Sequence, residues 1–198
     1  MAEVDVIIEI SKGGHIKYEY DKDKKILICD RILHTPMKYP FNYGFIPNTL
    51  SEDGDPLDVV VLMEDELTPG CMIRCKLLGY LDTKDESGYD PKVIVCPIEK
   101  IDPIWRNINN LYNLININTD YYNSLLENKM DNKLEKNTHI LLKIKYFFQH
   151  YKDLENKYVI VGDFHNLTET LNVYNDSLLR YKNKGIQKNK ITNYFERT

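Results

Sequence analysis

Residues 51–62 read SEDGDPLDVVVL and join an acidic turn to a buried strand. Gly54 and Pro56 favour turns, and the apolar run Val59–Leu62 is typical of a strand that is buried on both faces. Three aspartates fall within six positions: Asp53, Asp55 and Asp58. One or two aspartates would fit an ordinary turn, but mutual repulsion opposes the ionisation of three unless a cation lies among them. The stretch therefore indicates a metal site at the start of a strand.

A second acidic segment, DTKDESGYDPK at 82–92, places Asp85 and Asp90 between two predicted strands. Taken alone, this segment also fits a solvated hairpin loop. If the strands are neighbours in one barrel, the aspartates of both segments converge at one rim. Oxygen ligands without His or Cys select Mg²⁺, Mn²⁺ or Ca²⁺. A calcium-binding EF-hand loop is excluded because Pro56 and Leu57 occupy positions that need ligands.

Short strands separated by Gly, Pro and Asp fill the first hundred residues. Apolar alternation and short apolar runs predict strands at 4–10, 16–20, 25–33, 59–63, 72–81 and 93–98. No helical pattern alternates with them, which favours a closed antiparallel barrel over a doubly wound sheet. We expect a mainly β fold with flanking helices (α+β), in one domain over residues 1–198.

The second half of the chain has a different composition, with seventeen asparagines in residues 101–198 against two in 1–100. Residues 107–133 show no clean period and are interpreted as an Asn-rich insertion or long loop. Apolar spacings of three and four predict helices over 140–154, with Asn137 or Thr138 as the N-cap, and over 167–178. A strand at 158–161, ended by Gly162, lies between them. The basic end, about 182–198, is expected to be flexible.

Composition narrows the possible partners. The chain has 26 basic and 30 acidic residues, which gives a net charge of −4. This charge argues against nucleic acid as the main partner, because phosphate binding requires a basic surface. The N-terminus has no basic segment before an apolar run, and no stretch approaches the ~18 apolar residues that span a bilayer, so we expect a cytoplasmic protein with no membrane partner. The four cysteines are expected to be buried free thiols rather than zinc ligands: Cys29, Cys71, Cys75 and Cys96.

Basic and phenolic residues occur in unusual contexts around the acidic segments: Lys17, Arg31, Lys92, Tyr39, Tyr43, Tyr151 and Lys152. Individually, each is more often a solvent-facing strand residue or a long side chain lying along apolar surface. Together with metal-loaded carboxylates, they indicate a pocket for a small, highly charged phosphate compound.

These segments resemble the family I soluble inorganic pyrophosphatases, specifically the bacterial type. The family signature, D-[small/polar]-D-[PE]-[apolar]-D-[apolar], is matched in full by DGDPLDV at 53–59. The similarity continues through IKYEYDKD (16–23), MKYPFNYGFIPNTL (37–50), KDESGYDPKVIVCP (84–97) and FFQHYKDLE (147–155). The resemblance implies an OB-like, five-stranded closed β-barrel with its active site at one mouth. It also implies Mg²⁺-dependent hydrolysis of inorganic pyrophosphate to two orthophosphates, by in-line attack of a metal-activated hydroxide.

The resemblance further implies roles for the matched residues. The expected metal-binding residues are Asp53, Asp58, Asp85 and Asp90, with Glu9 acting through water. The expected catalytic residues are Asp55, the candidate general base, with Tyr43, Lys17 and Arg31. The expected contacts to the phosphoryl groups are Lys17, Arg31, Tyr43, Lys92, Tyr151 and Lys152. Supporting positions are Glu19 and Tyr39.

Assembly and two rival functions stay open at this point. Relatives of the bacterial type are commonly hexamers, so we expect a homo-oligomer, although an insertion near 107–133 would alter its packing. His150 is equally well interpreted as a subunit contact or as an ordinary surface histidine. An OB-like barrel that binds single-stranded nucleic acid through tyrosines is a rival that the clustered aspartates oppose. A family member retained only as a structural subunit is another, opposed by the complete set of matched residues.

Overall fold

The computed structural model describes residues 2–111 and 132–195, with side chains described in 2–111 and 140–185. Most of the predicted insertion, 112–131, lies outside these residues. Its last two residues, 132–133, are helical, because α2 (Asn132–His150) begins at Asn132. The predicted N-cap at Asn137 or Thr138 was therefore wrong, as both lie within this helix.

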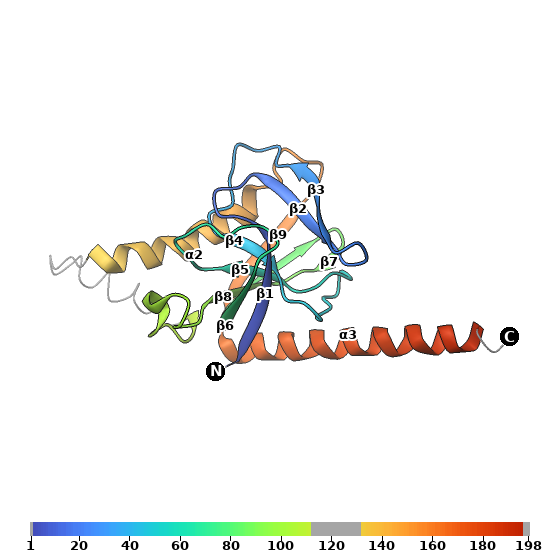
Figure 1. Ribbon diagram of the computed structural model, residues 1–198. Coiled ribbons are helices and arrows are strands. Elements are labelled where there is room, and N and C mark those ends of the chain that lie inside the picture. Colours follow the sequence, from blue (N-terminus) through green and yellow to red (C-terminus); the bar gives the residue numbers. More distant parts are fainter. Residues whose placement is uncertain (1, 112–131, 196–198) are drawn as a thin grey trace.

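Five strands pair in a closed ring in the order β1, β4, β5, β8, β6 and back to β1. Their bounds are β1 Glu3–Ile10, β4 Asn42–Phe45, β5 Asp58–Val61, β6 Met72–Asp85 and β8 Lys92–Pro97. This ring confirms the five-stranded barrel within a mainly β fold (Figure 1). Closure leaves no unpaired edge within the ring. One expectation needs correction, because β5 and β8 run parallel while the other ring pairs are antiparallel.

Strand β4 is not among the strands predicted from the sequence, because Pro40 and Gly44 are residue types that favour turns. All four of its residues are buried, and it lies between β1 and β5. A Cβ on Gly44 would lie 1.9 Å from the carbonyl oxygen of Ile7, so only glycine allows β1 to approach this closely. The glycine that resembled a turn residue is instead required by strand packing.

Four further strands lie outside the ring. β2 (Ile16–Asp21) and β3 (Ile26–Ile32) form a separate two-stranded sheet, and the short β7 (Gly88–Tyr89) and β9 (Val159–His165) both pair with β6. The predicted end of the last strand at Gly162 was wrong, because β9 continues to His165. A Cβ at Gly162 would come within 2.7 Å of the Asp82 side chain, so this glycine permits close contact with β6.

Side chains on both faces of the barrel strands are buried in two clusters. In β5, Val59 and Val61 belong to one cluster, while Val60 belongs to the other. Burial of each such side chain stabilises the fold by roughly 1.5–3 kcal/mol. Burial on both faces explains why the sequence of β5 is continuously apolar instead of alternating.

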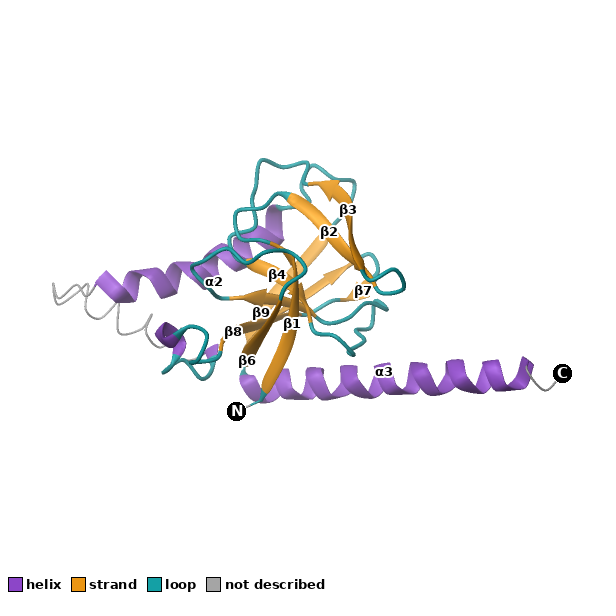
Figure 2. Cartoon of the chain, viewed as in Figure 1, coloured by secondary structure: helices purple, strands orange, loops and turns teal. Residues whose placement is uncertain are grey.

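Helices lie against the barrel (Figure 2), and their side chains pack on the two clusters. The end of α2 packs Phe147 and Phe148 against Tyr39 and Phe41, with ring centroids 4.6 and 5.5 Å apart for Tyr39–Phe147 and Phe41–Phe148. A 3₁₀ turn, Pro103–Trp105, buries Trp105 in the same cluster. The long α3 (Leu167–Phe195) packs its first turns against the other cluster through residues including Leu171.

The basic end of the chain, from about residue 182, is expected to be flexible, and this stays a prediction. Helix α3 continues to Phe195 and runs past the barrel as a straight rod (Figures 1 and 2). The apolar pattern stops at Leu178 because contact with the barrel ends near there. Lysine and glutamine still favour helix beyond this point, since their side chains lose little freedom in it.

The cysteines are free, as expected, but not all are buried. Cys75 and Cys96 are buried, whereas Cys29 is exposed and Cys71 is half-buried. The expectation failed for Cys29 because β3 lies in the two-stranded sheet, outside the ring, where solvent reaches it. Among the helices that the structure describes, none is long and apolar enough to cross a membrane.

We expect Gly44→Ala to reduce the free energy of unfolding by about 3 kcal/mol or more, because its methyl group would collide with the main chain of Ile7. Gly185→Ala is the matched control, since a Cβ there meets nothing and alanine favours helix by up to ~1 kcal/mol. Urea denaturation of both variants checks this. Equal midpoints for Gly44→Ala and the unmodified protein would contradict the packing argument.

Candidate active site

A cavity of about 530 Å³ brings together every site residue that the sequence singled out. Its lining includes Glu9, Lys17, Glu19, Arg31, Tyr39, Tyr43, Asp53, Asp55, Asp58, Asp85, Asp90, Lys92, Tyr151 and Lys152. These residues come from the barrel strands β1, β5, β6 and β8, from the two-stranded sheet, and from the segments around β4, β5, β7 and the end of α2. Seven of the fourteen are carboxylates and four are permanently basic, so opposite charges alternate around a small space.

The strand register places Asp58 at the mouth. Asp58 is the first residue of β5 and pairs with Phe45, while Tyr43 lies two residues earlier on β4. Residues two apart on a strand share a face, so the Tyr43 side chain points along β4 toward Asp58. Its hydroxyl donates a hydrogen bond of 2.5 Å to Asp58 Oδ2. Burial, followed by the charge of Asp58, raises the pKa of Tyr43, and the hydroxyl remains a donor at neutral pH.

Lys92 lies between two of the predicted metal ligands. Its Nζ is 2.6 Å from Asp58 Oδ2 and also donates to Asp90 Oδ2, and its side chain is only 4% exposed. Burial opposes charge on this lysine, but Asp58 and Asp90 outweigh burial and raise its pKa. A buried charge is costly unless it is paired, so these three side chains hold one another in place.

A second ion pair joins helix to hairpin. Lys152, directly after α2, donates to Asp85 Oδ2 at 3.0 Å, and the main-chain N–H of Ser87 donates to Asp85 Oδ1 at 2.8 Å. Burial raises the pKa of Asp85, but the bonds from Ser87 and Lys152 outweigh it, and the net direction is down. The carboxylate is therefore ionised and aimed across the cavity toward the helix.

Arg31 has partners that the sequence did not single out. Its Nε donates to Glu155 Oε1 at 3.1 Å, and Nη1 donates to Asp30 Oδ2 at 2.5 Å. Glu155 is 4% exposed, and its other oxygen is buried without a hydrogen-bond partner among the described residues. Burial opposes charge on Arg31, but the bonds to Glu155 and Asp30 raise its pKa. Only the position of Glu155 within FFQHYKDLE could have identified it.

The loop that carries DGDPLD is fastened at both ends. Thr49, which is 2% exposed, donates to the Ile46 carbonyl at 2.6 Å and accepts from Leu57 N–H at 2.9 Å. On the outer side, Leu50 N–H donates to the Ser177 carbonyl of α3 at 3.1 Å. Arg180 of α3 donates to the Leu50 carbonyl at 3.0 Å. The acidic turn is thus mounted on the barrel and supported by a helix distant in sequence.

Burial makes several carboxylates hard to ionise. Burial and then the charge of Asp58 raise the pKa of Glu9 to about 8, although Tyr20 N–H donates to its Oε1 at 2.7 Å. Burial also raises the pKa of Asp90 to about 6, with Asp58 adding to it against the opposing charge of Lys92. The pKa of Asp53 is raised too, chiefly by burial. At Glu9, Asp53 and Asp90, the cost of burying a charge therefore outweighs the attraction to nearby lysines.

Among the described residues, no three carboxylate, imidazole or thiol groups lie close enough to share an ion. The reason is visible in the contacts, because Lys92 separates Asp58 from Asp90 and Lys152 is bonded to Asp85. The donor set is nevertheless all oxygen, and burial, with a smaller contribution from the charge of Asp58, raises the pKa values of Glu9 and Asp90. Such a set fits a hard divalent cation, provided that these lysines move aside.

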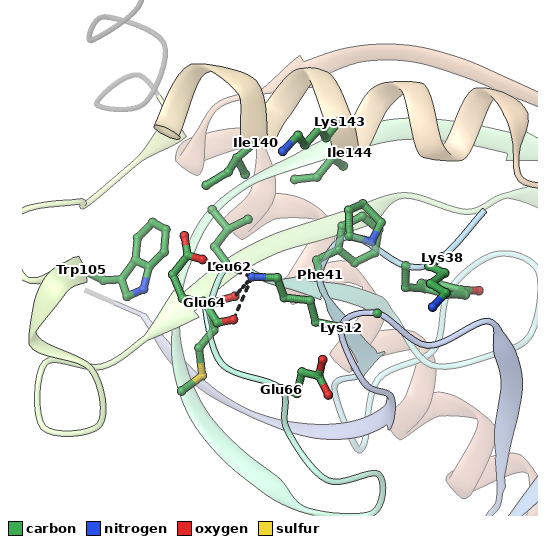
Figure 3. A pocket seen from close by; sticks show the side chains of 14 residues that line it. Lys12, Lys38, Phe41, Leu62, Glu64, Glu66, Trp105, Ile140, Lys143 and Ile144 are labelled. Atoms are coloured by element: carbon green, nitrogen blue, oxygen red, sulfur yellow. Dashed lines mark hydrogen bonds and ion pairs between the residues drawn. The ribbon is translucent and has the colours of Figure 1, made fainter. Parts of the chain in front are cut away.

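A larger cavity, about 700 Å³, lies next to the first and shares Tyr39 with it. Figure 3 shows Trp105, Ile140, Ile144 and Phe41 around it, with Lys12 bonded to Glu64. Among the described residues, two carboxylates line this cavity, Glu64 and Glu66. Its apolar walls offer no cluster of oxygen ligands, so the chemistry is assigned to the smaller cavity.

Comparison with known proteins decides the family. The family model described as inorganic pyrophosphatase matches residues 6–182. The chain belongs to this family. The inorganic pyrophosphatase of Aquifex pyrophilus is 39% identical over 184 residues, covering 92% of each chain. That of Saccharolobus solfataricus is 44% identical over 168 residues, covering 84% of this chain and 85% of the relative.

Solved pyrophosphatase structures agree with the fold. An inorganic pyrophosphatase of Helicobacter pylori superimposes with a TM-score of 0.77 at 38% identity, covering 91% of this chain and 94% of that one. One from Thermus thermophilus gives a TM-score of 0.73 at 33% identity, covering 91% of each. Membership of family I, bacterial type, which the sequence motifs indicated, is confirmed.

We expect Mg²⁺ to stabilise this pyrophosphatase far more at pH 8 than at pH 5. The pKa values of Asp90 and Glu9 are raised in the folded state. Their favourable contribution to the free energy of unfolding is therefore complete at low pH. It is lost as pH rises through about 6 for Asp90 and about 8 for Glu9. A bound dication would offset the cost of ionising these two carboxylates, so Mg²⁺ should raise the melting temperature by several degrees at pH 8.

Thermal melts with Mg²⁺ or EDTA across this pH range measure the effect. Glu9→Gln is the control, because an amide cannot titrate and should flatten the upper part of the profile. A Mg²⁺-induced shift that is the same at both pH values would contradict this electrostatic account.

Proposed function

We propose that this chain hydrolyses inorganic pyrophosphate to two orthophosphates with Mg²⁺ as its activating ion. The observation that carries the proposal is the convergence of fourteen charged and phenolic residues on one small cavity. Pyrophosphate is a compact polyanion, so its binding requires many positive charges in a small space. Membership of the pyrophosphatase family supports the same reaction.

We assign Mg²⁺ binding to Asp53, Asp58, Asp85 and Asp90, with Glu9 acting through water. Bound dications supply charge neutralisation and lower the pKa of water from 15.7 to about 7, which makes a nucleophile available at neutral pH. The cost of ionising these buried carboxylates supports the assignment, because a bound dication would offset that cost. Ionisation of Asp90 and Glu9 is part of ion binding.

Asp55 is assigned the role of general base, which holds the attacking water and takes its proton. Its side chain is 78% exposed and lies 3.7 Å from the ammonium of Lys22. An exposed carboxylate on a turn is free to meet water from the solvent side. Asp55 N–H donates to Asp53 Oδ1 at 3.0 Å, and this contact fixes the turn between base and metal ligand.

Binding of the phosphoryl groups is assigned to the basic residues and tyrosines: Lys17, Arg31, Tyr43, Lys92, Tyr151 and Lys152. In the ligand-free arrangement, Lys92 and Lys152 neutralise Asp58, Asp90 and Asp85. Mg²⁺ held by these aspartates would supply the positive charge that the two lysines provide here, and both ammonium groups would then be available to the substrate oxygens. Preorganised positive charge then stabilises the charge that develops on the leaving phosphate. Glu19, which pairs with Lys17 at 2.6 Å, and the buried Tyr39 support this wall.

We also propose a cytoplasmic homo-oligomer, a hexamer by resemblance to the family. Free thiols fit a reducing compartment. His150 has partners within its own chain, since Nδ1 lies 2.9 Å from Asp153 Oδ2 and its ring lies against Tyr146. Single-stranded nucleic acid is disfavoured as a partner because the cavity that holds Tyr43 and Tyr151 is ringed by carboxylates.

Asp58→Asn should lower Mg²⁺-dependent release of phosphate from pyrophosphate at least about 100-fold, because it removes a shared ligand. Asp163→Asn is the control, since this residue is 92% exposed and lies on β9 outside the cavity lining. Both variants should melt cooperatively. Near-normal hydrolysis by Asp58→Asn would remove Asp58 from the mechanism, and inactivity of the unmodified protein with Mg²⁺ would overturn the proposed function.

Lys152→Ala should raise KM for pyrophosphate and lower kcat together, by roughly 10-fold in each. The cause is loss of an ammonium group that faces the substrate and orients Asp85. Lys145→Ala on the preceding helix, α2, is the matched control, because Lys145 bonds to Asp163 at the surface. Steady-state kinetics decide the matter. A change in melting temperature with unaltered kinetics would assign Lys152 a structural role only.

A further inference from the structure

The antiparallel ladder that begins between β6 and β8 has a gap next to the active site. The last pair before the gap and the first pair after it are Leu81–Lys92 and Lys84–Tyr89. Both pairs belong to the same register, so the gap sets Thr83 directly opposite Asp90. Pro91, the next residue, has no N–H and cannot donate to the ladder. The chain therefore leaves regular pairing at the residue whose carboxylate enters the cavity.

Thr83 closes this gap with its side chain. Asp90 N–H donates to the Thr83 carbonyl at 3.0 Å, and the Thr83 hydroxyl donates back to the Asp90 carbonyl. In a regular hydrogen-bonded pair, both bonds are made between main-chain groups. Here the Thr83 hydroxyl takes the place of one main-chain donor. On the other edge of β6, Thr83 pairs with Val161 of β9. Thr83 is only 1% exposed, so water does not readily substitute for this bond.

The main chain of Asp90 is consequently restrained from two directions. Thr83 holds both its N–H and its carbonyl, and Pro91 restricts the preceding residue to an extended conformation. The Asp90 side chain is 15% exposed and points to Lys92, which also contacts Asp58. A shift of the Asp90 main chain would move its carboxylate relative to Asp58, which is the first residue of strand β5.

We propose that Thr83 is a positioning residue for the hydrolytic reaction, and that its hydroxyl sets the distance between the Asp90 and Asp58 carboxylates. This inference rests on the proposed function, in which both carboxylates hold Mg²⁺. Divalent magnesium demands near-ideal octahedral geometry, so it is sensitive to small displacements of its ligands. Residues that orient metal ligands typically change metal affinity or activity 10- to 100-fold when they are replaced.

The test compares Thr83→Val with Thr83→Ser in the full-length chain. Valine keeps the shape of threonine but removes the hydroxyl, whereas serine keeps the hydroxyl. We expect Thr83→Val to raise the Mg²⁺ concentration for half-maximal pyrophosphate hydrolysis by at least about 10-fold, and to lower kcat. Thr83→Ser should remain within about 3-fold of the unmodified protein. Isothermal titration of Mg²⁺ without substrate should show the same weakening, and a purely structural role would leave it unchanged.

Two controls separate the possible outcomes. Circular dichroism establishes that each variant is folded, and Thr83→Ala replaces Thr83→Val if the valine variant does not fold. Asp90→Asn tests the underlying assignment. If Asp90→Asn is inactive but Thr83→Val keeps normal Mg²⁺ dependence, the positioning role is overturned and the proposed function stands. Equal impairment of the valine and serine variants would also overturn the positioning role of Thr83. Normal Mg²⁺-dependent activity of Asp90→Asn would instead refute the role of Asp90 in the proposed function.

Discussion

The contact on which the site depends is the one that joins Asp58, Lys92 and Asp90. The carboxylates of Asp58, on β5, and of Asp90, between β7 and β8, are brought together where burial penalises charge, and a buried ammonium lies between them. Without a cation at this point, the acidic turn and the hairpin would repel each other. The barrel supplies the rigidity to resist this, because β5 and β8 pair directly and carry Asp58 and Lys92 as their first residues.

The surrounding structure supports this contact from several sides. The 530 Å³ cavity is closed by the end of α2, whose aromatic residues pack on Tyr39 and Phe41 while Lys152 reaches Asp85. Helix α3 supports the loop before DGDPLD from the outside. Glu155, with one unpartnered buried oxygen, holds Arg31 at the rim. Catalytic charge is thus mounted on elements whose own positions are fixed by packing.

The sequence predicted the barrel and the composition of the site because both leave local signals. Apolar runs mark the strands, and carboxylates crowded beside the Val59 strand need a cation wherever they lie. It did not predict β4, since the need for Gly44 arises from the approach of β1, nor the length of α3, whose outer turns bury little. Thr83 and Glu155 were missed because their importance lies in contacts with residues 7 and 124 positions away.

The central claim is that divalent ions replace lysine as the counter-charge of this carboxylate cluster. A crystal structure determined with abundant Mg²⁺ tests it most directly. The account predicts ions within about 2.0–2.1 Å of oxygens that include Asp58, with the Lys92 ammonium withdrawn from between Asp58 and Asp90. A well-resolved structure in which Lys92 still bridges the two aspartates, with no ion on any carboxylate of the cavity, would contradict it.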